Sequence, residues 1–506
     1  MDAAALEVIN DVAALQALVR EQAAAIAQRD ATIRTRDLTI QKLSHELARL
    51  RRVQFAARSE KMDPDQRELF EADMAADIAA VEAELASLQS PEQQARARHH
   101  APRRQLPEDL PRETVVHAPE HDHCTQCGDA LVKIGEHVSE KLDVVPMQFK
   151  VRRDVYPQYA CRHCETVVAE PVAPAIIDGG LAAPGLLAQV AIQKYADHLP
   201  LYRQEAIFAR HGIALSRTTL AEWIGAIGWQ LQPLVDRLRE KLLTCPVLHA
   251  DETPVAQLDP GSGKTHRAYL FAYRSTDAPP IVVFDYCLSR SGKHAAAFLG
   301  SWKGALMVDD YAGYKALFAA GVTELGCWAH ARRKFFDAWK ASGSALAKAA
   351  LERIGVLYAI EAELHDLDAS ARGAARQARL APPLAAFKAW LDDLAPKVLG
   401  NSGLARAIAY TQRRWSALAR VIDDGRYPID NNPAERAIRP IAIGRKNWLF
   451  AGSATAGKRA AAIMGLIATA RANGIEPHAW LTDVLTRLPT TKQHDIDTLL
   501  PLASSP

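Results

Sequence analysis

VLHADET, residues 247–253, joins an apolar run typical of a buried strand to two adjacent acids, of which Asp251 is the first. ALMVDD, residues 305–310, repeats this form and places Asp309 directly after its apolar run. Each strand is expected to end at its acid. Carboxylates at the ends of neighbouring strands can converge, as a divalent metal site requires. The two stretches therefore predict a sheet that carries metal ligands.

Further strand-like runs lie between residues 268 and 286, and Ala- and Leu-rich helical sequence extends from 331 to about 421. The helical segment is expected to be interrupted near Gly373 and at Pro382-Pro383. Strands followed by helices predict a mixed α/β core over residues 244–459, with a helical insertion at about 331–421.

A third acid, Glu435, stands in DNNPAER at residues 430–436. Asn432 is expected as the N-cap and Pro433 as the first helical residue, which gives Glu435 the third helical position. Spacing alone supports a capping-box role and a metal-ligand role equally. Basic and aromatic residues nearby favour the second, because they suit a DNA backbone led towards a metal-filled acidic pocket, although a solvated basic face is the alternative. They are Arg436, Arg439, Arg445, Lys446, Lys458 and Arg459, with Trp448 and Phe450.

Four of the seven cysteines form two C-x-x-C pairs, Cys124 with Cys127 and Cys161 with Cys164. Two such pairs predict a closed tetrahedral zinc site with a structural role, in a small β-rich module over residues 113–173. The alternative is two redox-active or unligated pairs. Zinc ribbons of this kind contact DNA or other proteins, and the sequence does not choose between these partners.

Residues 1–62 contain neither Gly nor Pro, and apolar residues recur at alternating steps of three and four. The pattern predicts a parallel coiled coil and therefore self-association, with a long solvated helix as the alternative. Residues 63–112 are expected to form an acidic helix and then a basic, Pro-containing linker. The first apolar series consists of Val12, Val19, Ile26, Ile33, Ile40 and Leu47.

Residues 181–243 have a helical pattern, within which a helix ending at Arg210 and a Gly-containing turn precede Ser216, a candidate N-cap. Two helices joined in this way match the helix–turn–helix motif, whose second helix enters the major groove of DNA. A helix pair of the protein core is an equally supported alternative. The groove-facing residues would be Arg217, Thr218 and Thr219. Residues 460–506 are expected to form a C-terminal helical region.

GSGKT, residues 261–265, is similar to a phosphate-binding loop, but Leu258 stands where the first glycine of that motif is required. A turn between two strands is the better interpretation. The chain has no apolar run long enough to span a membrane and no secretory signal, and its formal net charge is +2. A cytoplasmic protein without membrane partners is expected.

Several long motifs together resemble the transposases of the insertion-sequence sixty-six family. The resemblance extends over nearly the whole chain, including RSEK at residues 58–61, the cysteine module, and the KY and PLYRQ motifs at 194–195 and 200–204. The most specific motifs are HADETP (249–254), VDDYAGY (308–314), CWAHARRKF (327–335), PIDNNPAERAIR (428–439) and GRKNWLF (444–450).

The resemblance implies an RNase-H-like catalytic core whose DDE triad is Asp251, Asp309 and Glu435, interrupted by the helical insertion. It implies cleavage of DNA at transposon ends and strand transfer into target DNA, with Mg²⁺ or Mn²⁺ at the triad. Small accessory proteins of the same element, and association with the nucleoid, are also implied. The family usually has Gly after its second Asp, so Asp310 is an alternative ligand to Asp309.

The expected architecture is therefore multidomain α+β: a coiled-coil helix, a zinc-ribbon-like module, an HTH-like helical region, and an RNase-H-like core. Direct contact with DNA, or support of the site, is expected for His330, Arg332 and Arg333. Two other functions remain open: a DNA-binding repressor of the element that does not cut, and a general RNase-H-like nuclease without preference for particular ends.

Overall fold

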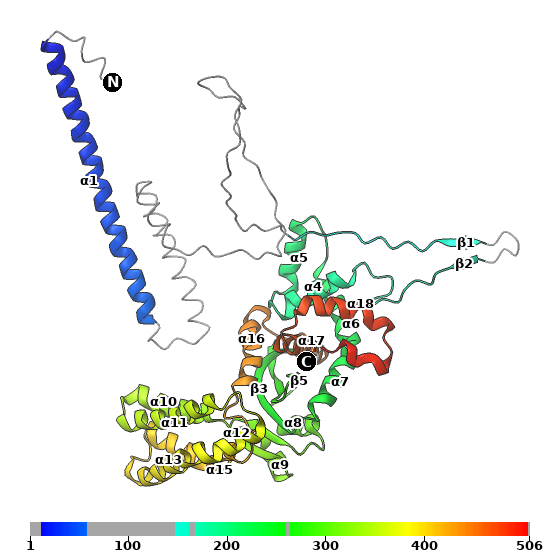
Figure 1. Ribbon diagram of the computed structural model, residues 1–506. Helices are drawn as coiled ribbons and strands as arrows, with labels where there is room; N and C mark the ends of the chain where they lie inside the picture. The colour runs from blue at the N-terminus through cyan, green and yellow to red at the C-terminus, as the bar shows by residue number, and fades with distance from the viewer. Residues whose placement is uncertain (1–11, 58–146, 161–166, 260–263, 504–506) are drawn as a thin grey trace. The chain divides into compact units, whose positions relative to one another are not determined.

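The computed structural model describes residues 12–57, 147–160, 167–259 and 264–503 (Figure 1). The chain divides into two units, 1–145 and 146–506, which are described separately. The acidic helix and linker predicted for 63–112 lie outside the described residues, and so do both C-x-x-C pairs. Among the described residues, no helix combines the length and apolarity needed to cross a membrane.

In the first unit, helix α1 (Val12–Ala57) runs for 46 residues without a break. The predicted continuous helix is thus confirmed over this range. Three members of its first apolar series, Val19, Ile26 and Ile33, are 65%, 56% and 54% exposed. Within a single chain these side chains are left in solvent, and their pairing with a second helix stays a prediction.

In the second unit, strands β1 (Gln158–Ala160) and β2 (Val167–Ala169) pair antiparallel. The segment that joins them contains Cys161 and Cys164 and lies outside the described residues. These two paired strands flank the second cysteine pair, which agrees with the predicted β-rich character of this module.

A five-stranded mixed sheet forms the centre of the second unit, in the order β5-β4-β3-β6-β7. Strands β3, β4 and β5 pair antiparallel, whereas β3, β6 and β7 pair parallel. The strands are β3 (Val247–Asp259), β4 (Lys264–Ser275), β5 (Val282–Cys287), β6 (Ala305–Val308) and β7 (Thr323–Gly326). The turn predicted near residue 261 lies outside the described residues, and the antiparallel pairing of β3 with β4 on either side of it agrees with a connection between two strands.

Helices cover both faces of this sheet (Figure 1). On one face, α16 (Asn432–Trp448) and α17 (Ala454–Ala472) pack on side chains of β3, β4 and β5 such as Val255 and Phe284. On the other face, α8 (Gly292–Leu299) packs on residues such as Tyr273. Because side chains alternate along a strand, each strand presents one set of residues to each layer.

The predicted helical region contains four helices, and they share one hydrophobic core with the sheet and with α18 (Pro477–Arg487). Gly212 makes the turn between the second and third helix with a φ of +77°, and the Ser216 hydroxyl caps the third by accepting the Thr219 N–H at 3.1 Å. The geometry of the predicted helix–turn–helix is thus present. The helices are α4 (Pro184–Tyr195), α5 (Leu201–Arg210), α6 (Arg217–Gln230) and α7 (Gln232–Leu242).

The helical insertion has a hydrophobic core of its own, centred on Trp328, Phe335 and Phe387. It lies beside the β7 edge of the sheet, which α15 (Trp415–Ala419) contacts. Its helices are α10 (Trp328–Ser342), α11 (Ala345–Glu363), α12 (Ala369–Ala375), α13 (Ala381–Leu394), α14 (Gly403–Arg413) and α15 (Trp415–Ala419).

The interruptions predicted near Gly373 and at Pro382-Pro383 take the form of a change in helix type between them. Gly373 lies within α12, close to the backbone of Gly425. A π-helical segment, η3 (Arg376–Leu380), follows α12 and leads directly into α13, whose first turn holds Pro382-Pro383. The α-helix is thus interrupted just before the prolines, although the chain does not leave helical geometry there. The chain leaves helical geometry earlier, between α11 and α12, where the Asp368 side chain caps α12 by accepting the Ala371 N–H.

The exposed seam of α1 leads to a test of self-association. Replacing Ile26 and Ile33 together by Asp should shift the protein to a smaller species in analytical ultracentrifugation, because charges at seam positions disfavour helix pairing. Replacing Ala24 and Gln28 by Asp is the matched control, because both are exposed and lie off the seam, and it should leave the mass unchanged. An unchanged mass for the Ile26→Asp/Ile33→Asp protein would exclude this seam as the contact.

Candidate active site

Asp251 lies within β3 and not at its end, which corrects the expectation from the sequence. β3 continues to Asp259 because it pairs with β4 along its whole length, whereas its parallel pairing with β6 stops at His249 and Met307. Asp251 and Asp309 each follow that last parallel pair by two residues. Since alternate residues share a face of a sheet, this register turns both acids to the same face.

Asn431 brings the third acid to this face. Its Oδ1 accepts a hydrogen bond from His249 Nδ1 at 2.9 Å, and its Nδ2 donates to the Ala250 carbonyl at 2.9 Å. Its own backbone N–H points to Cys327 Sγ at 3.2 Å. Asn431 is only 1% exposed, so this contact is part of the core. It fixes the start of α16 beside the residue that precedes Asp251, although 182 positions separate Asn431 from His249 along the chain.

The start of α16 differs from the prediction by one residue. The helix begins at Asn432, and Asn431 holds the N-cap position without a capping side-chain hydrogen bond. The Asn431 side chain is engaged with β3, and that of Asn432 donates to Asp430 at 2.7 Å. Glu435 therefore makes no capping box. One of its carboxylate oxygens, Oε1, is buried without a hydrogen-bond partner.

The negative charges of Asp309 and Glu435 act on the carboxyl of Asp251. Burial raises the pKa of Asp251 to about 8, and the charges of Glu252, Asp309 and Glu435 act in the same direction. The N–H of Glu252, which donates to Asp251 Oδ1 at 2.8 Å, opposes the shift only partly. A buried carboxyl with like charges around it favours a cation at this place.

The two neighbouring acids are already engaged. Glu252 faces the opposite side of the sheet, where its carboxylate accepts hydrogen bonds from Arg290 at 2.8 Å and from the Tyr314 hydroxyl at 2.8 Å. Asp310 forms ion pairs with Arg413 and Arg414 of the insertion. The Asp309 carboxylate, in contrast, accepts only the N–H of Tyr311 at 2.8 Å among the side-chain hydrogen bonds of the described residues. Asp309 is thus the freer of the two candidate ligands.

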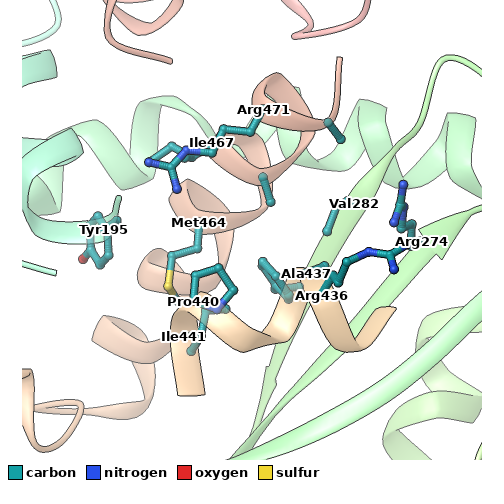
Figure 2. A pocket seen from close by; sticks show the side chains of 13 residues that line it. Tyr195, Arg274, Val282, Arg436, Ala437, Pro440, Ile441, Met464, Ile467 and Arg471 are labelled. Atoms are coloured by element: carbon teal, nitrogen blue, oxygen red, sulfur yellow. The ribbon is translucent and has the colours of Figure 1, made fainter. Parts of the chain in front are cut away.

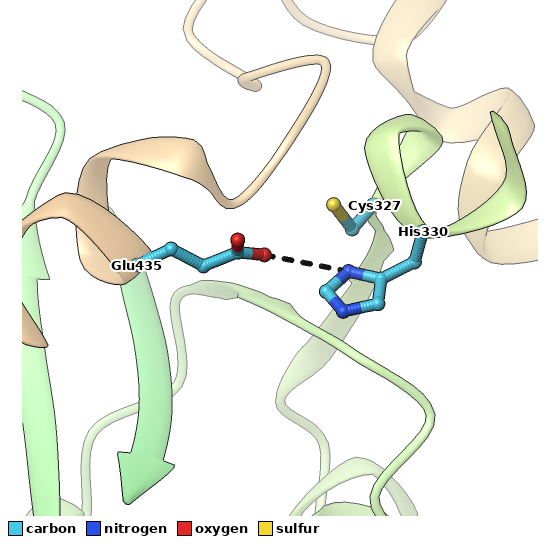
Figure 3. Close-up of side chains that lie close together, drawn as sticks. All are labelled: Cys327, His330 and Glu435. Atoms are coloured by element: carbon cyan, nitrogen blue, oxygen red, sulfur yellow. Dashed lines mark ion pairs between the residues drawn. The ribbon is translucent and has the colours of Figure 1, made fainter. Parts of the chain in front are cut away.

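Residues of α10 surround Glu435 from the other side. His330 Nδ1 lies 3.6 Å from Glu435 Oε1, and an Arg333 nitrogen lies 3.9 Å from Oε2 (Figure 3). Cys327 is next to them, and burial raises the pKa of its thiol to about 12. Neither Cys327 nor Asn431 was expected at the site, because a single thiol and a single amide in a sequence carry no sign of the partner they meet.

The residues predicted to bind DNA differ in whether they are held by the protein or exposed. Arg445 donates to the Thr253 hydroxyl and the Pro254 carbonyl, at 3.1 and 2.6 Å, and so ties α16 to β3. Arg436 and Lys446 on α16, Arg332 on α10, and Arg217 and Thr218 on α6 are exposed, while Arg439 and Thr219 are half-buried.

A cavity of about 290 Å³ lies between α16, α17 and the sheet (Figure 2). Its walls are mainly apolar, and its charged lining consists of three arginines, Arg274, Arg436 and Arg471, without an acid. Arg274 donates to the Pro433 carbonyl at 3.0 Å, and burial with the charge of Arg436 lowers its pKa. This concentration of positive charge begins one residue after Glu435 and suits a polyanion.

The donor set at the triad fits hard divalent cations. Asp251, Asp309 and Glu435 supply carboxylate oxygens, which Mg²⁺ and Mn²⁺ prefer. A bound cation would give the buried Oε1 of Glu435 a partner. It would also stabilise the charged form of Asp251 and so lower the raised pKa of that carboxyl. These acids would hold the ions between β3, β6 and α16.

The fold and the site define a class: a chain with a mixed sheet, acids gathered on one face, and basic surfaces around them. Comparison with known proteins gives the family. The chain matches the "Transposase IS66 family" over residues 179–459 and the "IS66 C-terminal element" over 465–502. Residues 121–165 match the "zinc-finger binding domain of transposase IS66", and 42–115 match "Transposase C of IS166 homeodomain".

The chain belongs to the IS66 family of transposases. Similar proteins from Sinorhizobium fredii span nearly the same length. "Uncharacterized protein y4jD" is 39% identical over 480 residues, which cover 91% of this chain and 94% of the relative. "Uncharacterized protein y4hP" is 33% identical and covers 91% and 87%, and "Uncharacterized protein y4qI" is 42% identical and covers 71% and 69%. The zinc-finger match contains all four paired cysteines and supports a structural zinc.

Removing the Asn431 side chain should weaken both the fold and the site. Asn431→Ala leaves the His249 N–H and the Ala250 carbonyl without partners, which costs on the order of 2–4 kcal/mol in the free energy of unfolding. Asn432→Ala is the matched control and should cost below about 1.5 kcal/mol, because Asn432 bonds only to nearby Asp430. Urea unfolding measures both values, and equal losses would show that the contact with β3 contributes nothing special.

The raised pKa of Asp251 predicts a pH-dependent stability. Its pKa of about 8 in the folded protein lies above the ordinary 3.8, so its contribution is fully present below pH 4 and is lost as the pH rises towards 8. Asp251→Asn has no such titration. Without added Mg²⁺, its stability advantage over the native protein should grow from near zero at pH 4 to a few kcal/mol at pH 8. Chemical unfolding across this range tests the expectation, and a constant difference would contradict it.

Proposed function

We propose that this transposase cleaves DNA at the ends of its element and joins them to target DNA, with Asp251, Asp309 and Glu435 as its catalytic acids. The observation that carries the proposal is the arrangement around β3. The register of β3 with β6 turns two aspartates to one face, the Asn431 contact ties the start of α16 to β3, and the charge of Glu435 acts on Asp251. Membership of a transposase family supports the same reaction.

The sheet supports an RNase-H-like core. Three antiparallel strands continue into two parallel ones, and the first acid lies on the central strand, which belongs to both parts. The second acid follows the neighbouring parallel strand, and the third lies in the first turn of α16, which packs on β3 and β4. The insertion between the second and third acids folds around its own core, so it leaves this arrangement intact.

Asp251, Asp309 and Glu435 would hold two Mg²⁺ or Mn²⁺ ions, which supply activation of water or a 3′-hydroxyl and stabilisation of the leaving oxygen. Asp309 is assigned as the second ligand in preference to Asp310. Arg413, the last residue of α14, and Arg414, which follows it, form ion pairs with the Asp310 carboxylate. Tyr311 and Glu252 orient Asp309 and Asp251 through backbone N–H groups.

DNA is expected to approach along the exposed cations next to Glu435. Arg436 and Lys446 continue from the third acid along α16, and Arg333 faces Glu435 from α10. The three arginines around the cavity extend this surface. A backbone of phosphates would bind here without base specificity, since such contacts position DNA and do not discriminate sequence.

The other modules would recognise the ends of the element and assemble the protein on them. The exposed first turn of α6, with Arg217 and Thr218, would contact the element's ends as a helix–turn–helix does. The zinc module would add a second contact to DNA or to protein. Self-association through α1 would bring two catalytic centres to two ends, and small accessory proteins of the element would complete the assembly.

The proposal is tested with labelled duplexes carrying the element's ends, incubated with purified protein and Mg²⁺ or Mn²⁺. Native protein should nick the ends. Asp251→Asn, Asp309→Asn and Glu435→Gln should each lower the cleavage rate at least about 100-fold while end binding is retained, because even residues that only orient metal ligands change activity 10–100-fold. Asp310→Asn is the matched control and should cleave at a rate near that of the native protein.

Other outcomes identify the two other functions. Binding of ends without cleavage by native protein would indicate a repressor. Cleavage of ends and unrelated duplexes at equal rates would indicate a general nuclease. Loss of cleavage in Asp310→Asn but not in Asp309→Asn would reverse the assignment of the second ligand.

A further inference from the structure

Three different metal-binding side chains meet where α10 and α16 begin (Figure 3). Cys327 Sγ, a ring nitrogen of His330 and a carboxylate oxygen of Glu435 all lie within 4.8 Å of one another. In the part of the chain that the structure describes, no other group of three or more His, Cys, Asp or Glu residues meets this spacing. The proposed use of Glu435 with hard cations leaves the thiol and the imidazole unexplained.

The distances within this group are those of ligands and not of a hydrogen bond. His330 Nδ1 and Glu435 Oε1 are 3.6 Å apart, which is too long for a hydrogen bond. Both atoms are buried, and neither has another partner. Nitrogen and oxygen ligands about 2.0 Å from a tetrahedral ion lie about 3.3 Å apart. The observed separation is thus close to that of two atoms bound to one ion.

We propose that Cys327, His330 and Glu435 form a second metal site, selective for Zn²⁺ or another thiophilic divalent ion. Sulfur, imidazole nitrogen and carboxylate oxygen are all zinc ligands, and a thiolate discriminates against Mg²⁺. Three protein ligands leave a fourth position for water. This site is separate from the four-cysteine module, whose residues lie elsewhere in the sequence.

The surroundings of Cys327 prepare it for such binding. Binding converts the thiol to a thiolate bonded to the ion, and the displaced proton passes to solvent. The Asn431 N–H already points to Sγ at 3.2 Å and would remain as a donor to the thiolate. The same asparagine fixes α16, so Glu435 and Cys327 are held in register by one residue. His330 and Glu435 are 25% and 29% exposed, which gives the ion an entry path.

Zinc at this site would compete with catalysis. Glu435 belongs to both sites, and a carboxylate drawn towards Cys327 and His330 is withdrawn from Asp251 and Asp309. Zinc is therefore expected to inhibit Mg²⁺-dependent cleavage. This consequence rests on the proposed function, whereas the binding of zinc does not.

The binding test uses full-length protein without DNA. Native protein should take up one equivalent of Zn²⁺ beyond that of the four-cysteine module, measured by metal analysis after gel filtration and by calorimetric titration. Co²⁺ added to zinc-loaded protein should give a thiolate-to-metal absorption band. Cys327→Ser and His330→Gln should each weaken this uptake at least about tenfold, since even an indirect loss of ligand support has this effect.

Cys245→Ser is the matched control, because Cys245 is a half-buried free cysteine whose thiol contacts the Lys241 carbonyl and Asp277 and does not belong to the site. It should keep the extra equivalent. The proposal is overturned if native protein takes up no extra zinc, or if both ligand variants retain the uptake. His330→Gln decides the question if circular dichroism shows that Cys327→Ser does not fold.

The competition test separates this inference from the proposed function. Zinc should inhibit cleavage by native protein at concentrations that fill the site, and about tenfold more should be needed for Cys327→Ser. Extra zinc uptake without any DNA cleavage would refute the proposed function and leave the metal site standing. Cleavage without extra uptake would do the reverse.

Discussion

The amide of Asn431 is the contact on which the candidate site depends. It bonds to the His249 ring and to the Ala250 carbonyl, and it does so in the core. Burial lowers the pKa of His249 to about 4, so the ring is neutral and its Nδ1–H can donate to the amide oxygen. Without this contact, α16 would be attached to β3 mainly through Arg445 and apolar packing, and Glu435 would have no fixed place beside Asp251.

The second constraint is electrostatic. The packing of α16 against β3 removes much of Asp251 from water, and the charges of other acids act on it there. Such a group either keeps its proton or attracts a cation. Positive side chains on α10, α14 and α16 stand around the acids, but Arg413 and Arg414 bind Asp310 and leave Asp309 free. The Asp309 carboxylate therefore stays available to a cation from solution.

Much of this could be predicted from sequence because local signals agree with the fold. Short apolar runs gave the strands that carry Asp251 and Asp309, and Ser216 marked the start of α6. Asp251 was expected at a strand end because the apolar run stops just before it, whereas the antiparallel partner that extends β3 is not visible in the local sequence. The same holds for Asn431 and Cys327, whose roles arise from chain segments about a hundred or more residues away. Gly373 and Pro382-Pro383 marked a change of helix type and not an end of the helix, because the π-helical segment between them accommodates the prolines.

The insertion leaves and rejoins the core at one point. Its first helical residue, Trp328, donates its backbone N–H to the carbonyl of Ile429 at 3.1 Å, and everything between them folds on a separate core. Because the two ends of the insertion meet, its length does not affect the distances among the three acids. The entropy of closing such a loop grows only with the logarithm of its length. This architecture leaves evolution free to enlarge, shrink or replace the excursion while the chemistry at its base is preserved.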